Sequence, residues 1–354
     1  MTRNILILGA SYGSLLGLKL ALGGHDVHLV CLPQEAELFN AEGAIVRMPI
    51  KGREGLVEIN SKAASGKLSA SPPAGVEPNR FDLVVLAMQE PQYRSPGVRE
   101  LLEALAKGRV PTMSIMNMPP LPYLARIRGL DTKSLRVAYT DATVWDAFDP
   151  DLMTLCSPDP QAFRPPEEKV NVLQVRLPTN FKAARFSSDT HTAMLRELEA
   201  DVEAVRWPVD GARVELPVKL KVHQSIYVPL AKWAMLIAGN YRCVGKDGMR
   251  PIKEAVHSDI AATRATYNWV VELCVGLGAA RDDMVPFEKY AAAALSLGSP
   301  SSAARALAAG AQNIERVDKL VQTIAGSKGQ RLAGLDETVA LVDQWLAKNR
   351  VKAA

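Results

Sequence analysis

The chain opens with residues whose types and spacing could hold a phosphate. An apolar run at residues 5–8 ends in Gly9, and a second glycine, Gly13, follows after Ser11 and Tyr12. Such a turn between a strand and a helix lets backbone approach a pyrophosphate and aims the N–H groups of the helix N-terminus at it. We therefore expect a dinucleotide to bind here, on Gly9, Ser11, Tyr12 and Gly13.

This turn departs from the usual dinucleotide pattern G-x-G-x-x-G. Ser11 takes the place of the middle glycine, and Gly13 comes one residue early. A tight turn that binds nothing is therefore an alternative. The second expected strand ends in Cys31-Leu32. These residues are neither the acid that binds the ribose of NAD nor the arginine that favours NADP. The choice between the two cofactors stays open on these positions.

A second group of polar residues could handle a proton. Lys219, His223 and Tyr227 are spaced four residues apart. On a helix this spacing places their polar tips in a row along one face. Reduction of a carbonyl needs a proton donor near the developing alkoxide, and either Lys219 or His223 could serve as a catalytic residue. The alternative is a solvated lysine and a hydrogen-bonded histidine on a core helix.

The elements that must position these residues alternate between strand and helix over the first 140 residues. This alternation predicts parallel βαβ units with right-handed crossovers, and so a doubly wound sheet. Strands are expected at 4–8, 25–31, 81–88, 111–117 and 135–140, and helices at 13–22, 34–40 and 98–106. Residues 61–80 are rich in Ser, Ala, Gly and Pro and predict a surface loop.

The remaining chain changes character towards helix. A strand is expected at 170–178 and a helix at 192–205, and further helices near 217–243, 251–277, 284–296, 300–309, 312–325 and 335–348. We predict an α/β chain with a Rossmann-like dinucleotide-binding domain at 1–210 and an all-helical substrate and dimerisation domain at 211–354. Ligands of such sheets bind at the carboxyl ends of the strands.

Composition narrows the class of protein. The 354 residues are 48% hydrophobic and 23% charged, and the net charge of +4 is not clustered, which argues against a nucleic-acid partner. The sequence contains no run of 18 apolar residues, as a membrane span would need, and the N-terminus does not resemble a signal peptide. Four cysteines without a C-x-x-C pair predict reduced thiols and no metal site. We expect a cytoplasmic protein.

Three further segments carry a family resemblance. SIMNMPPLPYLARI, with Asn117, resembles a strand that ends in Asn before a helix. ELPVKLKVHQSIYVPL resembles a helix of the form E-L-x-x-K-L-x-x-N-x-x-x-N-P-L. SPSSAARALAAGAQNIERVDKLV resembles paired serines followed by a helix that contains Glu. In this order the segments resemble ketopantoate reductase, also called 2-dehydropantoate 2-reductase, and the chain resembles a diverged member of that family.

The resemblance implies a fold and a reaction. The helical domain of this chain would be similar to the C-terminal domain of 6-phosphogluconate dehydrogenase. In the family NADPH reduces a 2-oxo acid, the helix lysine is the general acid, and the two Asn of that helix hold the substrate. Lys219 would then be the acid, with His223 and Tyr227 at the Asn positions.

The same resemblance supplies the rest of the expected site. NADP is the expected cofactor, with NAD as the alternative, and the substrate is a small 2-oxo acid or a related carbonyl. Asn117 and Gln89 would lie beside the cofactor, and the substrate contacts would be Tyr227, Ser301, Ser302 and Glu315. N-capping of a helix explains the two serines equally well.

Departures from the family keep other functions open. Gln89 replaces a family lysine, and neither substrate Asn is kept at 223 or 227. One alternative is an opine-type reductive amination with His223 as acid and base. Another is a non-catalytic binding protein, which the contracted glycine turn favours. The alanine-rich stretches KYAAAALSL and SSAARALAAG favour pairing with a second copy of the chain, although packing within one chain explains them about as well.

Overall fold

The computed structural model describes residues 1–353, and its contacts divide the chain into two compact units. The first unit comprises residues 1–88, 92–123 and 144–226. The second comprises 89–91, 124–143 and the chain from Tyr227 onward. The boundary predicted at 210/211 differs from this division, because residues 211–226 pack with the first unit and two earlier segments join the second.

The first unit is built on an eight-stranded sheet with the order β14-β11-β8-β7-β6-β1-β2-β5. Neighbouring strands are parallel except β8 and β11. Its strands are β1 (Asn4–Leu8), β2 (Asp26–Val30), β5 (Leu68–Ser71), β6 (Leu83–Leu86), β7 (Thr112–Ile115), β8 (Met153–Ser157), β11 (Phe181–Ala184) and β14 (Leu220–His223). The apolar strands β1 and β6 lie at its centre and are almost wholly buried, as parallel strands covered on both faces are.

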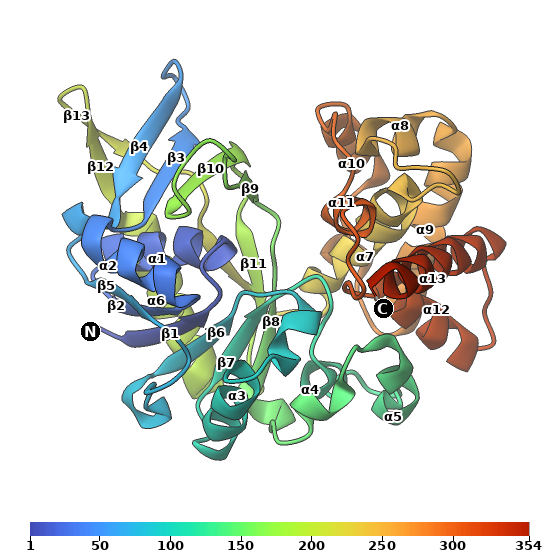
Figure 1. Ribbon diagram of the computed structural model, residues 1–354, viewed down its shortest axis with the longest axis horizontal. Coiled ribbons are helices and arrows are strands. Elements are labelled where there is room, and N and C mark those ends of the chain that lie inside the picture. Colours follow the sequence, from blue (N-terminus) through green and yellow to red (C-terminus); the bar gives the residue numbers. More distant parts are fainter. Residues whose placement is uncertain (354) are drawn as a thin grey trace. The chain divides into compact units, whose positions relative to one another are not determined.

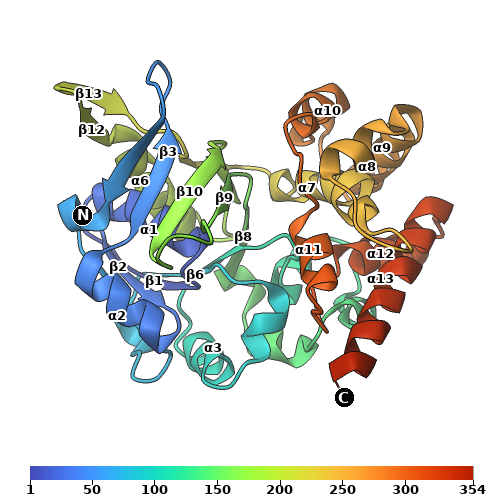
Figure 2. The same ribbon diagram turned by 45° about the horizontal axis from the view of Figure 1, so that its top comes forward.

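Smaller sheets and four longer helices complete this unit (Figure 1). A second sheet has the order β4-β3-β10-β9, and Figure 2 shows β3, β10 and β9 side by side. Helix α1 packs against β2 and α6, and α6 packs against β14. The bounds are β3 (Ile45–Pro49), β4 (Leu56–Asn60), β9 (Gln161–Phe163), β10 (Val172–Leu177), the hairpin β12 (Arg206–Val209) and β13 (Ala212–Glu215), α1 (Tyr12–Leu22), α2 (Pro33–Glu42), α3 (Val98–Lys107) and α6 (Asp189–Ala204).

The second unit is helical, and every named strand of residues 1–353 belongs to the first. Its helices are α5 (Thr132–Leu135), α7 (Lys232–Met235), α8 (Ile252–His257), α9 (Ile260–Gly276), α10 (Phe287–Ala294), α11 (Ser302–Ala308), α12 (Val317–Ser327) and α13 (Ala333–Ala353), and the short α4 (Leu121–Leu124) spans the division. A π-helix, Leu236–Asn240, continues α7. Within the described chain no helix is both long and apolar enough to cross a membrane. Among the same residues no three His, Cys, Asp or Glu side chains gather as a metal site would require.

The predicted fold class is confirmed, with three local corrections. Residues 135–140 form helical turns rather than a strand. The predicted loop at 61–80 contains β5, an edge strand of the main sheet that pairs with β2. The helix predicted to begin near 217 begins only at Lys232, and β14 takes its first part.

Candidate functional site

The glycine turn lies between β1 and α1, as the sequence predicts. Gly9 has φ +105°, and a Cβ at this position would lie 2.7 Å from the carbonyl oxygen of Ala87. A Cβ at Gly13 would lie 2.7 Å from Cγ2 of Ile7. The first glycine therefore allows the tight turn beside the end of β6, and the second allows α1 to pass close to β1. Both roles are those that a dinucleotide turn needs.

The geometry of this turn fits a phosphate-bearing ligand. The first N–H groups of α1 have no acceptor within the helix, because an α-helix leaves its first four donors unpaired. The Ser11 side chain makes no capping bond, while its carbonyl accepts from Ser14 N at 3.1 Å. At the end of β7, Asn117 Oδ1 is buried and finds no hydrogen-bond partner among residues 1–353. Such an orphaned polar atom fits a polar ligand better than a sealed core.

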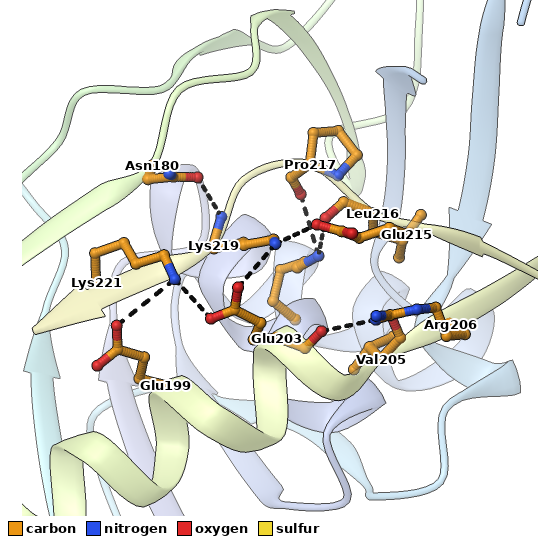
Figure 3. Close-up of polar contacts among 11 residues, drawn as sticks. Asn180, Glu199, Glu203, Val205, Arg206, Glu215, Leu216, Pro217, Lys219 and Lys221 are labelled. Atoms are coloured by element: carbon orange, nitrogen blue, oxygen red, sulfur yellow. Dashed lines mark hydrogen bonds and ion pairs between the residues drawn. The ribbon is translucent and has the colours of Figure 1, made fainter. Parts of the chain in front are cut away.

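Lys219 does not lie on a helix. The prediction that Lys219, His223 and Tyr227 line one face of a helix is therefore wrong. Lys219 directly precedes β14, and Lys221 and His223 belong to that strand, which pairs with β11. In Figure 3 the Lys219 ammonium points to two carboxylates, Glu203 at 3.1 Å and Glu215. The Lys221 ammonium lies 2.6 Å from the other oxygen of Glu203. The two lysines therefore form part of an ion-pair network that connects the start of β14 with α6.

The charges of this network keep Lys219 protonated. Hydrogen bonds from Lys221 and Lys219 lower the pKa of Glu203 to about 2. The hydrogen bond to Glu215, joined by that to Glu203, raises the pKa of Lys219 above its usual value. A donor whose pKa lies further above neutrality gives up its proton less readily. The network thus favours a structural role for Lys219.

Tyr227 is separated from Lys219 and His223 by the division of the chain. It is the first residue of the second unit, whereas the other two belong to the first. Its hydroxyl donates to Leu277 O at 2.8 Å, at the C-terminal end of α9. The hydroxyl thus fastens the start of the second unit to α9.

A different lysine occupies a helix in the second unit. Lys232 opens α7, and Asn240 ends the π-helix that follows. Both residues are half-buried, and between them only Met235 is not fully buried.

Hydrogen bonds connect this helix to the Ser and Glu segments of the resemblance. Ser301 Oγ donates to Asn240 O at 2.7 Å, and its oxygen accepts from Ala304 N at 3.2 Å as the N-cap of α11. The Tyr241 hydroxyl donates to the carbonyl of Glu315 and accepts from Val317 N at 3.0 Å. Burial raises the pKa of Tyr241 well above its usual value, so the hydroxyl keeps its proton.

Glu315 lies among buried polar groups of the second unit. It is 9% exposed, and its Oε1 accepts from Glu90 N at 3.3 Å. Glu90 in turn accepts from Thr140 N at 3.0 Å. Burial first, and then the charges of Glu90 and Glu315, raise the pKa of Tyr139. Two carboxylates and a phenol from three segments are thus gathered in one place.

The remaining predicted residues lie apart from this cluster or at its edge. Ser302 is exposed, and its Oγ accepts from Arg305 Nη2 at 3.3 Å. Gln89 is exposed and precedes the buried Glu90. Sequence reasoning missed Lys232, Asn240 and Glu90. The pattern K-x-x-x-N-x-x-x-N, applied from Lys232, would have reached Asn240 at its second Asn position, on the helix that the structure contains.

Comparison with solved structures shows that the fold is shared with ketopantoate reductases and with D-mandelate dehydrogenase. A 2-dehydropantoate 2-reductase from Methylococcus capsulatus has a TM-score of 0.65 and 14% identity, covering 98% of this chain and 97% of its own. D-mandelate dehydrogenase with NADH and anilino(oxo)acetate has a TM-score of 0.64 and 14% identity, covering 98% and 99%. The dimeric ketopantoate reductase from Staphylococcus aureus has a TM-score of 0.56 and 11% identity, covering 98% and 99%.

These similarities establish the fold over nearly the whole chain. No protein-family model matches the sequence, and no curated protein matches it either. The fold is therefore shared with ketopantoate reductases while the sequence has diverged far from them.

Proposed function

We propose that the protein is an NAD(P)H-dependent reductase of a small 2-oxo acid or a related carbonyl compound. One observation carries this proposal. The helix with Lys232 and Asn240 is hydrogen-bonded to the segments of Ser301 and Glu315, so the family's lysine helix, serines and glutamate meet in one unit. The shared fold with a ketopantoate reductase and with an NADH-bound dehydrogenase supports the same reaction class.

The first unit would hold the cofactor. The turn from Gly9 to Gly13 offers the N–H groups of the α1 N-terminus to a pyrophosphate, and Asn117 offers a buried amide at the end of β7. A reduced nicotinamide dinucleotide, when bound, supplies a hydride. We favour NADP over NAD as that cofactor.

The second unit would hold the substrate. Lys232, rather than Lys219, is our candidate for the general acid, because it lies on a helix with an amide side chain at the family's second Asn position. Its ammonium would give the proton that the carbonyl oxygen takes as negative charge develops there. The Asn240 amide would orient the substrate.

The test compares two lysine variants in one assay. Oxidation of NADPH and of NADH is followed with a panel of aliphatic and aromatic 2-oxo acids. Lys232→Ala should lower turnover by about 10²–10⁴-fold, the usual worth of general acid catalysis, and leave cofactor affinity nearly unchanged. Lys219→Ala, the matched control, should retain turnover. The reverse pattern would return the acid role to Lys219.

The alternatives have distinct signatures in the same experiment. Turnover that requires an added amine would indicate reductive amination of the opine type, in which His223 is the candidate acid and base. A folded chain that binds neither NADPH nor NADH would indicate a binding protein that has lost its cofactor.

The proposal extends to surroundings and assembly. All four cysteines are free thiols, and three of them are buried, which suits a reducing compartment such as the cytoplasm. The dimeric Staphylococcus aureus neighbour and the alanine-rich α10 and α11 together suggest a homodimer.

A further inference from the structure

An arginine from outside the first βα unit bridges the glycine turn and α2. Arg164 follows β9 directly, and its Nη2 donates to Ala10 O at 3.0 Å. Its Nη1 forms an ion pair with Glu35. At the other end of β9, Pro160 O accepts from the Tyr12 hydroxyl at 2.9 Å. Both ends of β9 are thus fastened to the first turns after β1 and β2.

The partner carboxylate lies where β2 ends. Glu35 is in the first turn of α2, and its Oε2 accepts from Leu32 N at 3.3 Å. Burial first, and then the charge of Glu35, raise the pKa of the Cys31 thiol to about 12 against the opposing charge of Arg164. Both charges therefore act on the residue that follows β2. The side chain of Arg164 is 27% exposed and that of Glu35 16% exposed, so a ligand can reach the pair.

The end of the second strand has a known role in dinucleotide-binding folds. The pyrophosphate lies on the first βα turn, and the adenosine ribose is read by residues at the end of the second strand. In this chain that strand ends in Cys31-Leu32, which has no charge. Leu32 is 64% exposed and offers an apolar surface beside the pair. Arg164, which contacts both Ala10 and Glu35, therefore lies where the adenosine ribose of a bound dinucleotide would lie.

We propose that Arg164 reads the 2′ position of the adenosine ribose and that Glu35 is the counter-charge which a 2′-phosphate displaces. The inference rests on the proposed function and selects NADP within it. A guanidinium matches phosphate with two parallel hydrogen bonds, and a phosphate dianion carries more charge than the carboxylate it replaces. When the ligand has a free 2′-hydroxyl instead, Arg164 keeps its ion pair with Glu35 and adds nothing to the affinity for that ligand.

The test measures two half-cofactors that differ only at this position. Affinities for 2′,5′-ADP and 5′-AMP are measured by titration calorimetry on the full chain. The unaltered protein should bind 2′,5′-ADP about 10-fold or more tightly than 5′-AMP, as charge-assisted hydrogen bonds would give. Arg164→Gln should bring the two affinities within about 2-fold of each other. Glu35→Gln should widen the difference, because the competing carboxylate is gone.

A second arginine of the same hairpin provides the matched control. Arg176 on β10 is exposed, with its guanidinium 4.7 Å from the ring centre of Phe163. Arg176→Gln should leave the ratio of affinities unchanged. Should Arg164→Gln fail to fold, Arg164→Lys keeps the charge without the two-pronged geometry and should reduce the ratio.

The failures of the two proposals can be told apart. Equal binding of 2′,5′-ADP and 5′-AMP, or an undiminished preference in Arg164→Gln, would overturn the role of Arg164 and leave a dinucleotide reductase standing. Absence of binding for both half-cofactors and for NADPH and NADH would remove the dinucleotide site, and this inference with it.

Discussion

One buried lysine fixes the turn that leads into β14. The Lys19 side chain of α1 is 1% exposed, and its Nζ donates to Leu216 O at 3.4 Å and Pro217 O at 3.1 Å. The next residue, Val218, has φ +62°, a conformation that a β-branched side chain rarely adopts. Lys19 therefore holds a strained turn in place, at the cost of burying its amino group.

This burial predicts a pH dependence of stability. Loss of hydration, with the charge of Lys219 adding to it, lowers the pKa of Lys19 from 10.5 to about 7. Between these values the unfolded chain binds a proton that the folded chain does not. The free energy of unfolding should therefore rise as the pH increases from about 7 to 10.5. The same gain in stability should be lost as the pH falls back towards 7.

Urea unfolding at several pH values measures this slope. Lys19→Met removes the titrating group, so its slope over the same window should be smaller than that of the unaltered chain. Lys51→Met, at an exposed position, is the control and should keep the slope. Equal slopes in all three proteins would exclude Lys19 as the group responsible.

At the scale of elements, the π-helix after α7 depends on a tyrosine from α10. The Tyr290 hydroxyl donates to Met235 O at 3.2 Å. A Cβ at Gly239 would collide with that hydroxyl. The glycine thus leaves room for the phenol, and the phenol pairs a carbonyl at the point where the helix widens. Together they shape the segment between Lys232 and Asn240.

A double-mutant cycle tests this pairing. Tyr290→Phe should cost about 0.5–1.5 kcal/mol for the lost hydrogen bond, and Gly239→Ala about 1–3 kcal/mol for overpacking. The double variant should cost less than the sum, because the phenylalanine leaves room for the added methyl group. Strictly additive costs from urea unfolding would contradict the coupling.

Several elements could be predicted from sequence because one local signal dominates. The apolar run before Gly9 predicts β1 with its observed bounds, Asn4–Leu8. Strand β5 could not be predicted from the sequence, because its residues, LSAS, have the same composition as the loop around them. Residues 219–223 alternate polar and apolar, as a strand does. The family pattern that contains Lys219 predicted a helix there instead, whereas the helix of the structure begins at Lys232.

The candidate site was less predictable because distant segments build it. Arg164 reaches Ala10 and Glu35 from a hairpin that no local pattern connects to the glycine turn. Glu90 joins Glu315 through a contact between residues far apart in the chain. Long-range pairings of this kind depend on topology, which periodicity does not encode.

At the scale of the whole molecule, we propose that a second copy of the chain binds the helical unit. Helices α10 and α11 bury Ala291, Ala294 and Ala304 within the chain, while Leu295 beside them is 53% exposed. We expect light scattering at micromolar concentration to give twice the chain mass, and Leu295→Lys to shift it towards the monomer. A single-chain mass that does not change on concentration would rule out the homodimer.

The discontinuity of the second unit bears on how the protein can be synthesised and divided. Its first segments, 89–91 and 124–143, leave the ribosome long before the rest of the unit, and β14, an edge strand of the first unit's sheet, emerges only after them. Glu90 can therefore pair with Glu315 only after more than half of the chain has followed it. A fragment that starts at Tyr227 lacks these two earlier segments, so we expect that it does not fold as an autonomous module. Exchange of this unit between relatives would have to carry its three separate segments together.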